Sequence, residues 1–339
     1  MSETSLKQPY ALYVGNVSAT SFAKTGIGIA HWRPEWCVGQ IRDTDDAVDL
    51  GLPDLTPAEA AERGAKTMVI GVVNHGGYID PVWVPTLAAA LDAGLDLANG
   101  LHARLTSIDV LATKAVKHGR ALHDVRHHDE PLAVGTGRPR AGRRMLTVGT
   151  DCAVGKMFTT FGMARAFEAR QHSARFVATG QTGVLIAGSG ICVDAVASDF
   201  ISGAAEALSP AQEDQDHWDL IEGQGSLFHP SFAGVTLGLV HGAQADALIL
   251  CHNATREHMM GLPGRPMPTL SSCIEAYERE ARLTAPKSRV VGISLNTSAM
   301  DEASARDLVA RTADEFGMPC VDTGRDGADV LVDAVLASG

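Results

Sequence analysis

The fold is decided by the stretch Val148-Gly149-Thr150-Asp151-Cys152-Ala153-Val154-Gly155-Lys156-Met157. An apolar run, residues 145–148, leads into it, and a helical pattern over residues 158–168 leads out of it. A strand, a glycine-bounded loop, Gly-Lys and a helix form the layout of a phosphate-binding loop. In such a loop, backbone N–H groups, the helix N-terminus and the lysine surround an anion. We therefore expect residues 149–157 to bind the phosphates of a cofactor.

Two features of this loop differ from the common form. The spacing from Gly149 to Gly155 is longer, and Met157 stands where a Ser or Thr hydroxyl normally holds Mg²⁺. A loop without that hydroxyl is better suited to holding phosphate than to hydrolysing it.

Composition limits the class of protein and of partner. The 339 residues suffice for two domains, with 45% hydrophobic and 20% charged residues. The net charge of −12 argues against a nucleic-acid partner. The one basic cluster, Arg138, Arg140, Arg143 and Arg144, falls in an apparent linker.

The sequence also bears on location and on metals. It has neither a signal-peptide core near its start nor an apolar run of membrane-spanning length, so we expect a cytoplasmic protein with no membrane partner. The six cysteines show no C-x-x-C spacing, and the histidines show no H-E-x-x-H spacing. His127-His128 makes a poor metal cage, so we expect no metal site.

Strand and helix patterns alternate along the whole chain, which predicts an α/β fold with parallel sheets. In the first half, the strands end at Gly15-Asn16, at Asn74-His75-Gly76-Gly77 and at Asn99-Gly100-Leu101-His102. Ligands bind beyond the carboxyl ends of such strands, although glycine and asparagine also serve simply to make tight turns.

The best boundary between domains lies in residues 129–144, where the apolar pattern is lost. We expect a Rossmann-like domain over residues 1–135 and a P-loop NTPase-like, doubly wound domain over residues 136–339. Within the second domain, residues 186–190 read as a glycine-rich hairpin or loop, and residues 195–208 read as one helix.

Two motifs resemble known families. Residues 149–156 resemble the long phosphate loop of dethiobiotin synthetase, and Ile221-Glu222-Gly223-Gln224-Gly225 resembles the strand-end motif that faces it in that enzyme. The Asn-His-Gly-Gly turn, the phosphate loop through Met157 and the stretch from Glu222 to Pro230 together resemble the DgcN family over nearly the whole chain.

The DgcN resemblance implies a D-glutamate N-acetyltransferase of D-amino-acid catabolism that uses acetyl-CoA and requires no metal. The phosphate loop would then hold coenzyme A phosphates. Transfer to an amine needs a general base, because an ammonium has no lone pair. The candidates are Glu222, His229, His252 and His75; Asp151 would contact the amine or brace the turn. Cys152 is a candidate acetyl-accepting nucleophile, although loop packing explains it more simply.

Glutamate also requires partners for two carboxylates. The predicted substrate contacts are Asn74, His75, Asn99, Gln181, Ser226 and Arg256, with Arg42, Arg104, Arg265, Thr182 and Asn253 as further candidates. The alternatives are an ATP- and Mg²⁺-dependent ligase or kinase, and a nucleotide sensor or NAD-binding protein. Met157 argues against the first, and the absence of a G-x-G-x-x-G motif after the first strand argues against NAD. A homo-oligomer is expected from the architecture.

Overall fold

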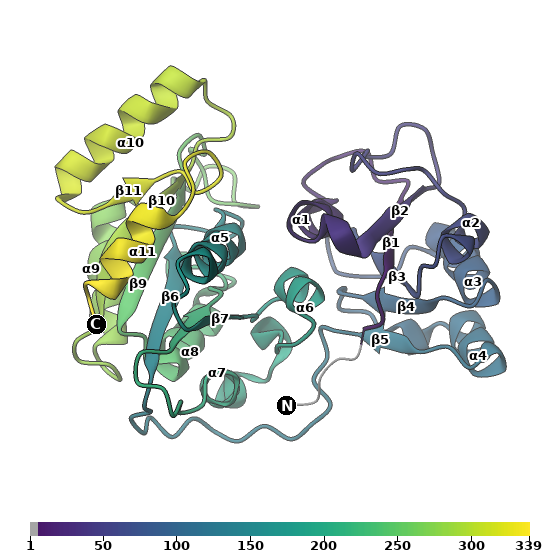
Figure 1. The fold of residues 1–339 in the computed structure, drawn as a ribbon, viewed down its shortest axis with the longest axis horizontal. Coiled ribbons are helices and arrows are strands. Elements are labelled where there is room, and N and C mark those ends of the chain that lie inside the picture. Colours follow the sequence, from purple (N-terminus) through teal and green to yellow (C-terminus); the bar gives the residue numbers. More distant parts are fainter. Residues whose placement is uncertain (1–5) are drawn as a thin grey trace. The chain divides into compact units, whose positions relative to one another are not determined.

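The computed structural model describes residues 6–339 and divides the chain into two compact units. The first unit comprises residues 1–129 and 180–195, and the second comprises residues 130–179 and 196–339. Each unit is built on one all-parallel sheet with helices packed against it (Figure 1). This confirms the expected α/β class.

The first unit has a five-stranded sheet in the order β2-β1-β3-β4-β5. The chain adds β2 on one side of β1, and then β3, β4 and β5 on the other side. Such a reversal of the winding direction is typical of doubly wound, Rossmann-like sheets. Its elements are β1 (Tyr10–Gly15), α1 (Lys24–Trp32), η1 (Pro34–Trp36), β2 (Cys37–Arg42), α2 (Pro57–Glu62), β3 (Thr67–Ile70), η2 (Pro81–Trp83), α3 (Val84–Asp92), β4 (Asp96–Asn99), η3 (Leu105–Ser107), α4 (Asp109–His118), β5 (Leu122–Asp124), α6 (Gln181–Ala187) and η4 (Val193–Ala195).

The second unit has a six-stranded sheet in the order β11-β10-β9-β6-β8-β7. Its elements are β6 (Arg143–Gly149), α5 (Lys156–Ala169), β7 (Ala174–Val177), η5 (Ser198–Phe200), α7 (Ile201–Leu208), β8 (Trp218–Ile221), α8 (Ala233–Ala243), β9 (Ala247–Asn253), α9 (Leu270–Ala281), β10 (Arg289–Asn296), α10 (Glu302–Phe316), β11 (Cys320–Val321) and α11 (Asp329–Leu336). The central strands are mostly buried and carry short apolar runs, as expected of a sheet covered on both faces.

Two local predictions between β7 and β8 need correction. Ile186 and Ala187 belong to α6, which buries Val184, Leu185 and Ile186, whereas residues 188–190 form the expected loop and no hairpin. The helix expected from residue 195 begins only at Ile201, after two separate 3₁₀ turns. Ser198 and Asp199 lie in the second of these turns, and both are residue types that disfavour the interior of a helix.

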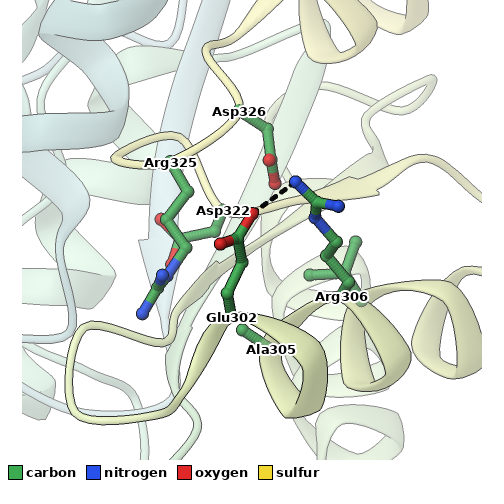
Figure 2. Close-up of a pocket in the computed structure, with 7 residues that line it drawn as sticks. Glu302, Ala305, Arg306, Asp322, Arg325 and Asp326 are labelled. Atoms are coloured by element: carbon green, nitrogen blue, oxygen red, sulfur yellow. Dashed lines mark hydrogen bonds and ion pairs between the residues drawn. The ribbon is translucent and has the colours of Figure 1, made fainter.

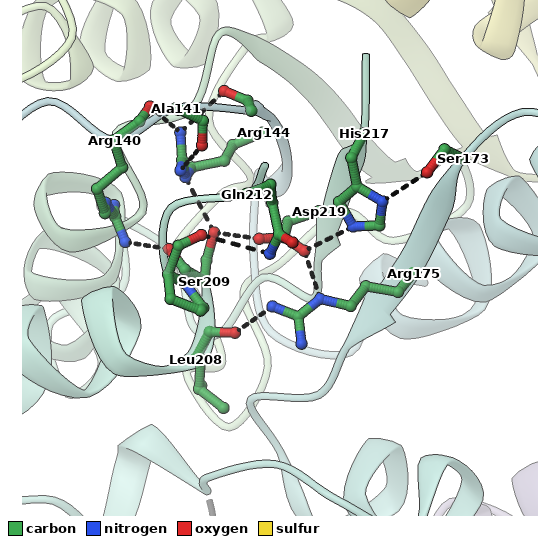
Figure 3. A network of polar contacts seen from close by, with 12 residues as sticks. Arg140, Ala141, Arg144, Ser173, Arg175, Leu208, Ser209, Gln212, His217 and Asp219 are labelled. Atoms are coloured by element: carbon green, nitrogen blue, oxygen red, sulfur yellow. Dashed lines mark hydrogen bonds and ion pairs between the residues drawn. The ribbon is translucent and has the colours of Figure 1, made fainter. Parts of the chain in front are cut away.

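Two arginines of the basic cluster in the linker, Arg140 and Arg144, have structural roles. Arg140 donates to the carbonyl oxygens of Ser209 at 2.6 Å and Gly242 at 2.6 Å, and burial lowers its pKa to about 10. Arg144 donates to the Ser209 hydroxyl, which in turn donates to the buried Asp219 carboxylate (Figure 3). The network lies at the amino ends of β6, β7 and β8. It therefore fixes the edge of the sheet opposite the phosphate loop.

Among residues 6–339, no helix combines the length and the apolar character needed to cross a membrane.

Two glycines, one in α7 and one in α8, provide a matched test of how closely α7 packs against residue 133. A Cβ added at Gly203 would lie 1.8 Å from the Ala133 carbonyl oxygen, whereas one added at Gly234 meets no heavy atom within 4 Å. We expect Gly203→Ala to lower the free energy of unfolding by about 1–3 kcal/mol or more. Gly234→Ala should raise it by about 0.5–1 kcal/mol, because alanine is the better helix former.

Thermal melting of the two variants beside the wild type checks this expectation. Equal melting temperatures for the two variants would contradict the close approach of α7 to residue 133.

Candidate functional site

Three neighbouring strands of the second unit bring together the predicted site residues of that unit. β6 lies between β8 and β9, and all three run parallel. The register pairs Leu146 with Ile221 and Gly149 with Cys251. The phosphate loop, Glu222 and His252 therefore leave the sheet at the same edge, as the sequence pattern predicts.

The loop between β6 and α5 has the tight backbone of an anion-binding turn. Ala153 has φ +51° and Gly155 has φ +109°. The φ value at position 155 favours glycine. A Cβ on Gly149 would come within 3.0 Å of the Lys156 ammonium nitrogen. The glycines at both ends of the loop are therefore required by its geometry.

Lys156 begins α5 and is buried at the centre of the loop. Its Nζ donates to the carbonyl oxygen of Asp151 at 2.9 Å and to that of Gly225 at 2.8 Å. Burial lowers the pKa of Lys156, and the neighbouring Cys152, Cys251, Asp151 and Glu222 oppose that shift. A bound anion would favour the charged ammonium in the same way.

Asp151 is fully buried and has one fixed carboxylate oxygen. Its Oδ2 accepts from Arg256 Nη1 at 2.9 Å and from the Met260 N–H at 2.6 Å, whereas its Oδ1 has no hydrogen-bond partner. Arg256 also donates to the carbonyl oxygens of Cys152 and Ala153. Arg256 therefore braces the outside of the loop, a contact that the sequence did not predict.

Glu222 follows β8 directly and is buried. Its Oε2 accepts from the Thr179 N–H at 3.0 Å, and its backbone carbonyl accepts from the Thr179 hydroxyl at 2.6 Å. The next residue must be glycine, because a Cβ on Gly223 would lie 1.7 Å from the Thr147 carbonyl oxygen and 2.9 Å from Lys156 Cδ. The carboxylate is thus fixed by Thr179, and the adjoining Gly223 lies against the lysine stem.

His229 is also buried beside the loop. Its Nε2 lies 3.0 Å from the Met260 carbonyl oxygen, and its Nδ1 accepts from the Ser231 N–H at 3.2 Å. Because a carbonyl can only accept, the proton is on Nε2 and Nδ1 carries the lone pair. One ligand atom each from Asp151, Cys152 and His229 lie within 4.8 Å of one another.

Tyr277, on α9, is a loop contact that the sequence did not predict. Its buried hydroxyl donates to the Gly149 carbonyl oxygen at 2.7 Å and accepts from the Leu227 N–H at 3.2 Å. Burial raises its pKa. Ser226 likewise donates to the Thr150 carbonyl oxygen at 3.0 Å. Both side chains tie the loop after β6 to the loop after β8. The only sequence signal for the Tyr277 contact is a single tyrosine on the buried face of α9.

The remaining predicted contacts lie in the first unit, where the side-chain amides of Asn74 and Asn99 close turns. Asn74 makes two hydrogen bonds with the Tyr78 backbone, and the buried Asn99 donates to the Ala103 carbonyl and to Asp124. His75 is exposed and packs edge-on against Phe22 at 5.1 Å between ring centroids.

The inserted helix α6 adds two further candidates to the first unit. Gln181 lies directly against Gly100. A Cβ added to Gly100 would be 2.9 Å from the Cβ of Gln181. Thr182 shares a hydroxyl hydrogen bond of 3.0 Å with Thr25 of α1.

The other candidates make structural contacts. Arg42 pairs with Asp54 and Arg104 pairs with Asp129. Arg265 reaches the Phe228 carbonyl oxygen at 3.4 Å, and the Asn253 side chain accepts from the Thr255 N–H and hydroxyl.

A pocket of about 260 Å³ lies between α10 and the turn after β11 (Figure 2). Charged groups line most of it, including the Glu302–Arg306 ion pair. It contains none of the predicted site residues, and its strand β11 is at the far edge of the sheet from β7.

The fold and the loop define a two-domain protein in which a Rossmann-like unit precedes a P-loop unit. Residues 38–128 match the domain of unknown function described as the DUF1611_N Rossmann-like domain, and residues 132–332 match the DUF1611_C P-loop domain. The chain belongs to the DUF1611 family.

Relatives of known name cover nearly the whole chain. A protein of Pseudoalteromonas named D-glutamate N-acetyltransferase is 46% identical over 327 residues, which cover 96% of this chain and 98% of the relative. One of the same name from Tritonibacter scottomollicae is 47% identical over 332 residues, covering 98% and 99%. These matches confirm the family expected from the motifs.

A crystal structure of a DUF1611 family protein from Anabaena variabilis is also similar. It has a TM-score of 0.89 and 36% sequence identity, and the match covers 98% of this chain and 100% of that one.

His252, at the end of β9, gives the site a pH dependence. Its Nδ1 lies 2.9 Å from the Thr150 hydroxyl, and burial, together with the nearby Arg256, lowers its pKa. As the pH falls through the ordinary histidine value of about 6.5, the unfolded chain takes up the proton before the folded chain does. Stability from this group is therefore present at higher pH and lost on acidification.

We expect the melting temperature of the wild type to fall more steeply between about pH 7.5 and about pH 5 than that of His252→Asn. Parallel curves for the two proteins would show that His252 does not carry this dependence.

Proposed function

We propose that this protein transfers the acetyl group of acetyl-CoA to the amine of D-glutamate. The observation that carries the proposal is the match, over nearly the full length, to two relatives named D-glutamate N-acetyltransferase. The loop chemistry agrees with it. Backbone donors and the buried Lys156 suit the phosphates of coenzyme A, and Met157 supplies no hydroxyl for Mg²⁺.

The proposed mechanism is a direct attack of the amine on the thioester. A base removes one proton of the ammonium, and the free amine forms the C–N bond to the thioester carbonyl carbon. The tetrahedral intermediate then loses a second proton from nitrogen and collapses to the amide as the C–S bond breaks, and the coenzyme A thiolate takes up a proton and leaves as free thiol. We propose Glu222 or His229 as the base. Asp151 would then position the loop through Arg256 and Met260.

The length of coenzyme A constrains this assignment. An extended pantetheine arm would carry the thioester away from phosphates held at Lys156, yet Glu222 and His229 both lie close to the loop. Either base therefore acts only if the arm folds back toward the loop. A fall in kcat for Glu222→Gln with an unchanged KM for acetyl-CoA supports a base. A change in that KM alone assigns Glu222 to binding.

The substrate contacts proposed in the first unit are Asn74, His75, Asn99 and Gln181, and those in the second unit are Ser226 and Arg256. The cytoplasmic location and the homo-oligomer remain predictions. The second candidate function, an ATP-dependent ligase or kinase, is favoured by the dethiobiotin-synthetase-like loop and disfavoured by Met157.

The activity itself is tested by thiol release. We expect the purified protein to release free thiol from acetyl-CoA when D-glutamate is added, without ATP. L-Glutamate and D-aspartate serve as matched acceptors, because each changes only stereochemistry or side-chain length. Mg²⁺-dependent ADP formation with no thiol release would replace the proposal by the ligase alternative.

Lys156 tests the role of the loop. Lys156→Ala removes the positive charge from the anion site, so we expect the KM for acetyl-CoA to rise at least about tenfold, the usual effect of losing one charged hydrogen bond. The KM for D-glutamate should change much less. Steady-state kinetics with each substrate varied in turn would reveal the reverse pattern, which would mean that the loop binds the acceptor instead.

A further inference from the structure

Asp151, Cys152 and His229 offer three different metal-binding atoms at one point beside the loop. A carboxylate oxygen, a thiol sulfur and an imidazole nitrogen lie within 4.8 Å of one another. From this arrangement we propose that the three side chains bind a divalent transition metal of the zinc type. The proposal concerns metal binding by this chain, and its test does not depend on the acetyl-transfer reaction.

The hydrogen bonds around the three residues are those of a prepared metal site. Ligating histidines almost always donate their other ring N–H to a carbonyl or carboxylate, and ligating carboxylates are themselves hydrogen-bonded. Here His229 Nε2–H donates to the Met260 carbonyl oxygen at 3.0 Å. The N–H of the same Met260 donates to Asp151 Oδ2 at 2.6 Å. One backbone residue thus orients both side chains.

We assign the atoms that these hydrogen bonds leave over, Asp151 Oδ1 and His229 Nδ1, to the cation. Asp151 is fully buried, and its Oδ1 has no hydrogen-bond partner, which is costly for a carboxylate unless a cation approaches. His229 Nδ1 carries the ring lone pair and accepts only the 3.2 Å contact from the Ser231 N–H, which ligation would displace. Cys152 adds a half-buried sulfur on the residue next to Asp151.

Distances and ligand type favour zinc-like ions over magnesium or calcium. Thiolate and imidazole suit zinc, cobalt and iron, whereas Mg²⁺ and Ca²⁺ take oxygen. Bond lengths of about 2.0–2.3 Å place tetrahedral ligand atoms about 3.5 Å apart, so small side-chain rotations would close the observed cluster. Three protein ligands leave a fourth position for water or substrate.

The two cationic side chains near the cluster, Arg256 and Lys156, are engaged by oxygens other than Asp151 Oδ1. Arg256 pairs with Asp151 Oδ2 and not with the unpartnered Oδ1. Lys156 points its Nζ at two carbonyl oxygens. Deprotonation of Cys152 on binding would supply a second negative charge, and its proton would be released to solvent.

The proposal replaces the expectation of no metal, which rested on missing sequence motifs. These ligands come from two loops far apart in the sequence, so no local spacing could have indicated them. A metal on His229 would also occupy its lone pair, which leaves Glu222 as the base for acetyl transfer.

The test uses the full chain, stripped with a chelator and titrated with Co²⁺. We expect one equivalent to bind and to give a thiolate-to-cobalt absorption band together with the visible bands of a tetrahedral ion. Cys152→Ser should abolish the thiolate band, and Asp151→Asn and His229→Gln should weaken binding at least about tenfold. Cys37→Ser, which changes a half-buried cysteine in β2, is the matched control and should keep the band.

Zinc protection provides a second measurement on the unaltered protein. Stoichiometric Zn²⁺ should slow alkylation of Cys152, followed by peptide mass spectrometry, and should leave Cys37 unchanged. Absence of a thiolate band in the wild type, a band that survives in a folded Cys152→Ser protein, or alkylation of Cys152 unaffected by zinc would each overturn the proposal.

Discussion

The arrangement of the second unit depends on the buried ammonium of Lys156. It joins the carbonyl oxygens of Asp151 and Gly225, so a single cation connects the loop after β6 to the loop after β8. A buried charge is tolerated only where it is hydrogen-bonded or paired. The glycines follow from this requirement, because side chains at Gly149 or Gly223 would collide with the lysine or with the Thr147 carbonyl.

Much of this region could be predicted from sequence because its determinants are local. The apolar run before Gly149, the Gly-Lys pair and the helix that follows specify a phosphate loop whatever surrounds them. The parallel order of strands then placed Glu222 beside the loop. What escaped prediction depends on residues distant in the chain: the Tyr277 hydroxyl on Gly149 and the Met260 backbone between Asp151 and His229.

Other errors have a different physical origin. A short segment rich in glycine has weak local preference, so tertiary contacts decide its structure. That is why the glycine-rich pattern predicts a hairpin or loop from residue 186, although α6 buries three consecutive apolar residues and ends only at Ala187. The structural role of Arg140 in the linker was not predicted. Its partners are carbonyl oxygens at helix ends, which no charge pattern reveals.

The insertion of residues 180–195 into the first unit has a consequence for biosynthesis. Helix α6 packs against α1, and Gly100 lies against Gln181, yet these residues follow the phosphate loop and β7 in the chain. The amino-terminal sheet emerges from the ribosome long before the helix that completes its packing. The packing of the first unit is therefore completed only after the phosphate loop, β7 and α6 have been made, so the last step in forming the first unit follows synthesis of part of the second.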